Sequence, residues 1–252
     1  MPIITLLTDF GTTDHYVAEI KGVLLTRAPG VTLVDMTHSV SPGDVRSGAY
    51  ILGRTWHRFP PNSIHMVVIE PGVGTSRAAL ALSASGHAFV GPDNGVFTPV
   101  LQDTPVEAVL LATPETASPT FHGRDLFAPA AATLARGTPL HTLGQPFTGI
   151  PERLAYTTPH YEGKSIIGEI LYIDRFGPLI TNLTSELVPG YASLEVEDLD
   201  IGPLRRTYAD VGTGGLLAYI GSAGAIEIAV RNGSAARRLG VGVGGRVRAR
   251  LG

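Results

Sequence analysis

The sequence predicts an α/β N-terminal domain with a largely parallel sheet, followed by a smaller, mostly β, barrel-like C-terminal domain. Over the first 145 residues, short β-branched runs alternate with helical patterns, which is typical of βαβ units. Further along, strand-like runs are separated by Gly, Pro and Asp turns. A proline-containing stretch without periodicity lies between them. We therefore expect an α/β domain at 1–147, a linker at 148–164 and a β-rich domain at 165–252.

Each expected element follows from its own pattern of apolar residues. In the first domain, apolar runs predict strands at 3–7, 31–36 and 64–69. Apolar residues at helical spacing predict helices at 14–27, 43–58 and 123–136. In the second domain, short runs bounded by turn residues predict strands at 165–174, 179–183, 192–199, 216–221 and 225–230.

The composition narrows the function classes. The 252 residues contain no cysteine, so the chain has no disulfide, thiolate metal site or cysteine nucleophile, which fits a reducing compartment. No metal-ligand spacing is found among His38, His65, His87 and His122, and we expect neither a metal nor a cofactor. A net charge of −3 with scattered basic residues does not predict nucleic-acid binding. Without a signal-peptide pattern or a membrane span, the sequence predicts a cytoplasmic protein with a small-molecule partner and no membrane association.

Polar side chains follow the predicted strands, at the edge where an open α/β sheet places its ligand crevice. Five clusters share this position: Asp9 with Asp14, Asp35 with His38 and Asp44, Glu70 with Arg77, GPDNG at 91–95, and FHGRD at 121–125. Singly, each has an ordinary structural explanation. Asp9 or Asp14 could cap the following helix, Arg124 and Asp125 could form a local ion pair, and Glu70 and Arg77 could be a salt bridge that holds a turn.

The order of these motifs is more specific than any one of them. TDFGT, D.TH, EPGVGT.R, GPDNG and HGRD.FAPAAA are followed by IDRFG and IGS…IEIAVRNGSAA. Over nearly the full chain, this series resembles the S-adenosyl-L-methionine hydroxide adenosyltransferases, which are related to fluorinating and chlorinating enzymes. The resemblance implies that water splits S-adenosyl-L-methionine into adenosine and L-methionine, without a cofactor. It also implies a homotrimer with sites between subunits.

The resemblance assigns the catalytic roles to Glu70, Arg77 and His122. The leaving group is a neutral thioether, so the reaction needs a well-placed nucleophile rather than a general acid. A guanidinium, a carboxylate and an imidazole around one water would stabilise developing hydroxide and orient or accept its proton. The family usually has aspartate at the position of Glu70. The halogenating relatives lack the aspartate, arginine and histidine set and carry an additional loop, so Arg77 and His122 favour water over halide.

The substrate-binding roles also come from the resemblance. Asp9 corresponds to the ribose clamp, Asp174 to the residue that holds the methionine ammonium group, and Ser222 to one that meets its carboxylate. Pro178 stands where the family usually has the asparagine that reads adenine, and proline offers no side-chain hydrogen bond and no amide donor. Adenine recognition then falls to backbone groups, to Asn182, or to the segment around Arg231 and Asn232.

Two other functions are compatible with these departures from the family pattern. The chain could be a non-catalytic protein that binds S-adenosyl-L-methionine or adenosine, with Glu70 and Pro178 marking a decayed site. It could also be a transferase that uses halide to form a 5′-halogenated adenosine.

Overall fold

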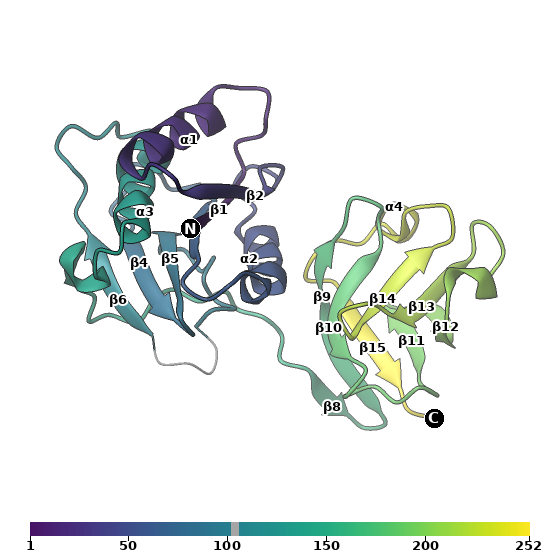
Figure 1. The fold of residues 1–252 in the computed structure, drawn as a ribbon. Coiled ribbons are helices and arrows are strands. Elements are labelled where there is room, and N and C mark those ends of the chain that lie inside the picture. Colours follow the sequence, from purple (N-terminus) through teal and green to yellow (C-terminus); the bar gives the residue numbers. More distant parts are fainter. Residues whose placement is uncertain (102–105) are drawn as a thin grey trace. The chain divides into compact units, whose positions relative to one another are not determined.

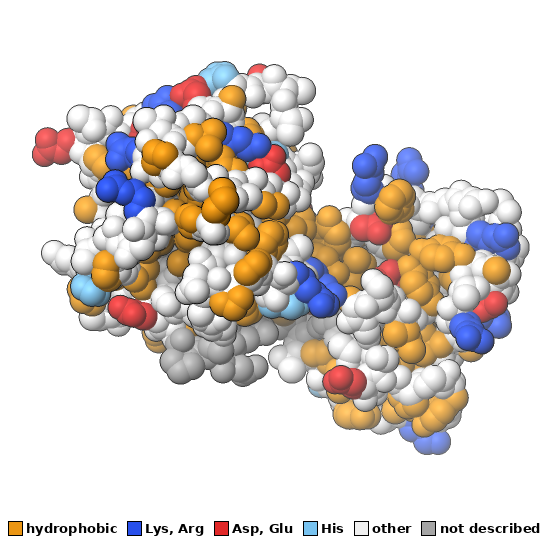
Figure 2. Space-filling view, in the orientation of Figure 1, with side chains coloured by type: hydrophobic (Ala, Val, Ile, Leu, Met, Phe, Trp, Pro, Cys, Tyr) orange, Lys and Arg blue, Asp and Glu red, His pale blue; other side chains and the backbone are white. Residues whose placement is uncertain are grey.

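The structure, a computed structural model, describes residues 1–101 and 106–252 and divides into two compact units, Met1–Leu154 and Ala155–Gly252. Figure 1 shows an α/β unit and a β unit, which confirms the predicted fold class. On the face drawn in Figure 2, charged side chains of both signs are scattered over each unit among exposed hydrophobic ones. Within the described residues, no helix has the length and hydropathy of a membrane span.

The first unit is built on a seven-stranded sheet in the order β2-β1-β3-β5-β4-β6-β7. Its strands are β1 (Ile3–Thr8), β2 (Thr32–Thr37), β3 (Ile64–Val68), β4 (Ala79–Ala84), β5 (His87–Pro92), β6 (Glu107–Leu111) and β7 (Gly144–Pro146). The four strands β2, β1, β3 and β5 are parallel, whereas β4, β6 and β7 join by antiparallel pairing. Because β1 and β3 pair in parallel with Thr8 opposite Val68, the residues that follow both strands lie at one edge.

Helices bury both faces of this sheet (Figure 1). On one side, α1 (Tyr16–Arg27) and α3 (Ala128–Ala135) pack against side chains such as Leu6 and Met66. On the other, α2 (Val45–Thr55) packs against Leu7 and Val67. This two-sided burial explains why β1 and β3 are buried along nearly their whole length rather than at alternate residues.

The helix ends differ in detail from the sequence expectation. The predicted helix at 43–58 is α2 followed by the 3-10 helix η1 (Trp56–Arg58), with Ser47 N donating to Asp44 Oδ1 at the N-cap over 3.0 Å. The predicted helix at 123–136 begins as a π-helical turn, η2 (Gly123–Phe127), before α3. The N-cap of α1 is His15, with no side-chain cap hydrogen bond, so neither Asp9 nor Asp14 caps this helix.

The second unit is a closed barrel of seven strands in the order β10-β14-β13-β12-β11-β15-β9, closed by pairing of β9 with β10. Its strands are β9 (Ser165–Ile173), β10 (Leu179–Thr184), β11 (Ser193–Val196), β12 (Leu199–Arg205), β13 (Leu216–Ile220), β14 (Ala225–Val230) and β15 (Arg246–Arg250). The short β8 (His160–Glu162) extends the sheet at β9. Inward-facing residues of all seven strands form one core that includes Ile166, Leu179 and Ile228. Closure leaves the barrel without an open edge apart from β8.

Candidate active site

A tight turn after β3 carries Glu70 and Arg77. Gly74 in this turn has φ +76°, and a Cβ there would lie 2.7 Å from the backbone oxygen of Pro119. Only glycine therefore lets the turn approach the segment that leads into His122. Asn94 holds the start of the turn by donating from Nδ2 to the Ile69 carbonyl over 2.8 Å.

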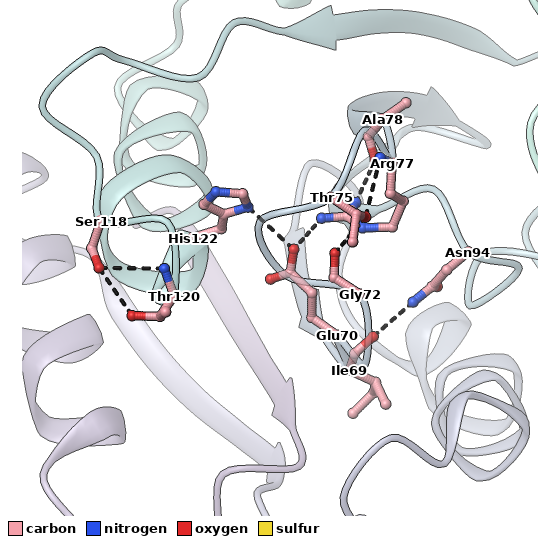
Figure 3. Close-up of polar contacts among 10 residues, drawn as sticks. All are labelled: Ile69, Glu70, Gly72, Thr75, Arg77, Ala78, Asn94, Ser118, Thr120 and His122. Atoms are coloured by element: carbon pink, nitrogen blue, oxygen red, sulfur yellow. Dashed lines mark hydrogen bonds and ion pairs between the residues drawn. The ribbon is translucent and has the colours of Figure 1, made fainter.

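Glu70, Arg77 and His122 meet at one carboxylate oxygen, as Figure 3 shows. Arg77 Nη2 donates to Glu70 Oε1, and His122 Nδ1 lies 3.2 Å from the same oxygen. Arg77 also donates from Nη1 to the Ala78 carbonyl. The side chains of Glu70, Arg77 and His122 are only 5%, 12% and 10% exposed. Water therefore screens these charges weakly, and their mutual orientation is well defined.

Two polar atoms of this cluster have no hydrogen-bond partner among the described residues. Within the part of the chain that the structure describes, no group donates a hydrogen bond to Glu70 Oε2, and the buried Arg77 Nε has no partner. A buried donor without a partner is unfavourable by about 1–3 kcal/mol, so such atoms are usually satisfied by a ligand or water. The cluster thus combines a carboxylate oxygen, a cationic donor and an imidazole, and its hydrogen-bonding capacity is not fully used by the described residues.

His122 precedes the π-helical turn η2, a feature that is often found at functional sites. The two residues that follow Gly123 anchor this turn. Arg124 donates from Nε and Nη2 to the two oxygens of Asp125 over 2.7 and 2.9 Å, and from Nη1 to Glu19 Oε2 of α1 over 2.7 Å. The hydrogen bond from Arg124, opposed by partial burial, keeps the pKa of Asp125 below its usual value. Arg124 and Asp125 therefore form the local ion-pair arrangement that the sequence allowed.

Asp9 lies at the same edge of the sheet, directly after β1. Its Oδ2 accepts a hydrogen bond of 2.8 Å from Gly43 N, in the loop before α2. Partial burial raises the pKa of Asp9, and the hydrogen bond from Gly43 opposes that rise. The backbone beside it is fixed by His38, whose Nδ1 lies 2.8 Å from Thr8 Oγ1 and whose carbonyl accepts from Gly11 N over 2.7 Å. Asp9 is thus a half-buried carboxylate held in place by the backbone.

A pocket of about 590 Å³ in the second unit gathers three of the five site residues expected there. Asp174, Arg231 and Asn232 line this barrel pocket, and Pro178 lies beside them. The Oδ1 atom of Asp174 accepts from the backbone N atoms of Phe176 and Gly177 over 2.8 and 3.0 Å, which orients the carboxylate.

The other two expected residues lie elsewhere. Ser222 is exposed in the turn between β13 and β14 and does not line the barrel pocket. Both ends of the Asn182 amide are used within the unit, because Oδ1 accepts from Glu169 N over 2.8 Å and Nδ2 donates to the Thr157 carbonyl over 2.6 Å. The sequence reasoning also missed two aromatic residues that line the pocket, Phe176 and Tyr208. Phe176 directly precedes Gly177 and Pro178, which predict a turn, and this is the sequence signal that could have indicated it. In the structure its side chain is 76% exposed.

Comparisons with known proteins show the family to which the chain belongs. Residues 4–144 match the model of the SAM hydroxide adenosyltransferase N-terminal domain, and residues 168–248 match that of the C-terminal domain. An (R)-S-adenosyl-L-methionine hydrolase of Thermus thermophilus is 42% identical over 96% of this chain and 97% of the relative. A fluorinase of Actinoplanes sp. is 32% identical over 90% of each chain. The crystal structure of an uncharacterized conserved protein from Thermotoga maritima superposes with a TM-score of 0.89, at 35% identity, over 98% of this chain and 99% of that one.

Proposed function

Because the chain belongs to the S-adenosyl-L-methionine hydroxide adenosyltransferase family, we propose that it hydrolyses S-adenosyl-L-methionine to adenosine and L-methionine. Water attacks C5′ of the ribose, and the C–S bond breaks as methionine leaves. The sulfonium already carries the positive charge, so the departing thioether is neutral and needs no proton. The protein's task is to hold and polarise the water opposite the C–S bond.

The observation that carries this proposal is the meeting of Glu70, Arg77 and His122 at one oxygen. The Arg77 guanidinium stabilises negative charge as the water becomes hydroxide. The carboxylate of Glu70, with Oε2 still available, orients the water and, together with His122, accepts its proton. Each of these interactions strengthens as charge develops, which is the condition for raising the rate rather than only the affinity.

Glu70 supports catalysis despite being one methylene longer than the usual aspartate. Its carboxylate reaches both Arg77 and His122 in this chain, so the longer side chain does not pull the cluster apart. This arrangement favours an intact site over a decayed one.

The family resemblance assigns the rest of the substrate to residues outside this cluster. Asp9 accepts hydrogen bonds from the ribose hydroxyls, Asp174 binds the methionine ammonium group, and Ser222 meets the carboxylate. Adenine is recognised by the segment around Arg231 and Asn232, which lines the barrel pocket, whereas Asn182 does not line it. We also propose a cytoplasmic homotrimer with sites between subunits, on the strength of the family resemblance. Light scattering after size-exclusion chromatography tests the trimer.

One experiment separates this function from its two alternatives. The pure protein is incubated with S-adenosyl-L-methionine, with and without chloride or fluoride, and the products are resolved by chromatography. Adenosine with or without halide supports the hydrolase. A 5′-halogenated nucleoside would indicate a halide-using transferase, as the likeness to a fluorinase requires us to test. Binding without any product would indicate a non-catalytic binding protein.

A further inference from the structure

A carboxylate outside the proposed catalytic cluster lies at the start of a hydrogen-bonded chain in the second unit. Glu227 of β14 faces Tyr219 of β13 across the strand pair. Its side chain lies directly over the backbone of Gly221, where a Cβ would come within 1.9 Å of Glu227 Oε1. Among the described residues, no Lys, Arg or His forms an ion pair with Glu227, and the Tyr219 hydroxyl donates to its Oε2. The charge is therefore held by a phenol instead of a cation.

The chain continues to the barrel pocket. The Tyr208 hydroxyl lies 2.9 Å from that of Tyr219, and Tyr208 lines the pocket that also contains Asp174 and Arg231. The backbone at Tyr208 is fixed by a capping box in which Thr207 Oγ1 accepts from Ala209 N and Asp210 Oδ2 accepts from Thr207 N. Tyr208 is therefore held in place on both its main-chain and side-chain sides.

The direction of these hydrogen bonds follows from which groups have a proton to donate. A carboxylate only accepts, so Tyr219 must give its single hydroxyl proton to Glu227. The Tyr208 hydroxyl must then donate to the Tyr219 oxygen, because that oxygen has lone pairs but no second proton. Burial and the hydrogen bond to Glu227 strongly raise the pKa of Tyr219, which keeps this proton in place. The lone pairs of Tyr208 Oη are then free to accept a hydrogen bond from the pocket. The Glu227 carboxylate, through Tyr219, polarises this oxygen.

We propose that Glu227, Tyr219 and Tyr208 form a relay that makes Tyr208 Oη an acceptor for a nitrogen hydrogen-bond donor of the substrate. Arg175, Arg231 and Arg237 contribute only donors to the lining of this pocket. Asp174 also offers an acceptor, but its Oδ1 already accepts from two backbone N–H groups. Pro178, in the same lining, contributes no side-chain hydrogen bond. The inference rests on the proposed function, whose substrate carries two nitrogen donors of this kind, the adenine 6-amino group and the methionine ammonium group.

The test measures binding of adenosine, inosine and L-methionine to the full chain by calorimetry, for wild type, Tyr208→Phe, Tyr219→Phe and Glu227→Gln. Tyr208→Phe removes a charge-assisted hydrogen bond, so the affinity for the recognised ligand is expected to fall roughly tenfold. Tyr219→Phe should weaken it several-fold, although Tyr219 does not line the pocket. Tyr191→Phe is the matched control, because this tyrosine is 72% exposed and lies outside the pocket, and it should bind as wild type does.

The three ligands distinguish the two sources of the donor. Inosine carries a 6-oxo group in place of the amine. If the relay variants bind adenosine more weakly and the ratio of adenosine to inosine affinity falls toward one, Tyr208 recognises the adenine amine. Weaker methionine binding with unchanged adenosine binding supports recognition of the ammonium group. If all three relay variants keep wild-type affinity for every ligand while wild type hydrolyses S-adenosyl-L-methionine, the relay is wrong and the proposed function stands. If wild type binds none of the ligands and forms no product, both are overturned.

Discussion

Replacing Glu70 with glutamine tests whether its charge takes part in the reaction. The amide keeps the size of the side chain and one acceptor for Arg77, but it loses the negative charge that orients the water and accepts its proton. Loss of a general base costs about 10²–10⁴-fold in rate, so kcat should fall by that factor while the affinity for S-adenosyl-L-methionine stays within about tenfold.

The same change also affects stability, because Glu70 and Arg77 are nearly buried, at 5% and 12% exposure. Breaking a buried ion pair costs roughly 3–5 kcal/mol. We expect the lower end of that range, since the amide oxygen can still accept from Arg77. Rates must therefore be compared at a temperature at which urea unfolding shows the variant to be folded. Glu115→Gln is the control, because Glu115 is an exposed carboxylate of the same unit and its loss should leave the rate unchanged.

Shortening Glu70 to aspartate gives the complementary result. The backbone after β3 places the glutamate carboxylate within reach of both Arg77 and His122. Removing one methylene withdraws it by more than about 1 Å, and misplacement on that scale can cost about 100-fold in rate. Adenosine release by Glu70→Asp should therefore fall below wild type. Wild-type rates from both variants would refute the assignment and make the carboxylate structural.

Three further changes have defined outcomes. Arg77→Ala should remove most turnover, while calorimetry should show an affinity for S-adenosyl-L-methionine within roughly tenfold of wild type. An equal loss of binding and rate would instead show that Arg77 binds the substrate without acting on the water. Asp9→Ala should weaken binding of adenosine itself, and unchanged adenosine binding would contradict the ribose assignment. Burial and the neighbouring His87 lower the pKa of His65 to about 3. Below pH 6.5, His65 binds a proton in the unfolded chain but stays neutral in the folded chain. The free energy of unfolding should therefore fall by up to about 1.4 kcal/mol per pH unit, which amounts to about 2 kcal/mol at pH 5 relative to pH well above 6.5. His65→Asn should flatten this dependence between pH 7 and 5 in urea unfolding, and an unaltered slope would show that other groups cause it.

The sequence was most informative where a local pattern determines the structure. The apolar runs before Asp9 and Glu70 predicted two strands of a largely parallel sheet. The structure shows that they are neighbours, and the register of β1 and β3 brings the following residues to one edge. The strands β12 and β15 were not predicted, because β12 contains Gly and Pro and β15 alternates arginine with apolar residues near the chain end. In the structure β12 pairs with its neighbours β11 and β13. Pairing with β11 and β9, whose residues lie far away in the chain, stabilises β15.

The candidate site, like the fold, was predicted from the sequence only in part. Spacing alone placed Glu70 and Arg77 on one turn, but the approach of His122 depends on Gly74 passing close to Pro119, which no sequence period encodes. The relay from Glu227 through Tyr219 to Tyr208 was not foreseen, because its three members come from separate elements and share no motif. Conversely, Asn182 is a plausible adenine reader in the sequence, and only the structure shows that its amide bonds to the backbone.

The most direct test of the mechanism is hydrolysis of S-adenosyl-L-methionine in water enriched in ¹⁸O, with both products analysed by mass spectrometry. Attack of water at C5′ predicts that adenosine gains one ¹⁸O atom at its 5′ oxygen and that L-methionine gains none. Methylthioadenosine or free adenine as the nucleoside product, or adenosine without the label, would contradict attack at C5′ by water held at Glu70, Arg77 and His122.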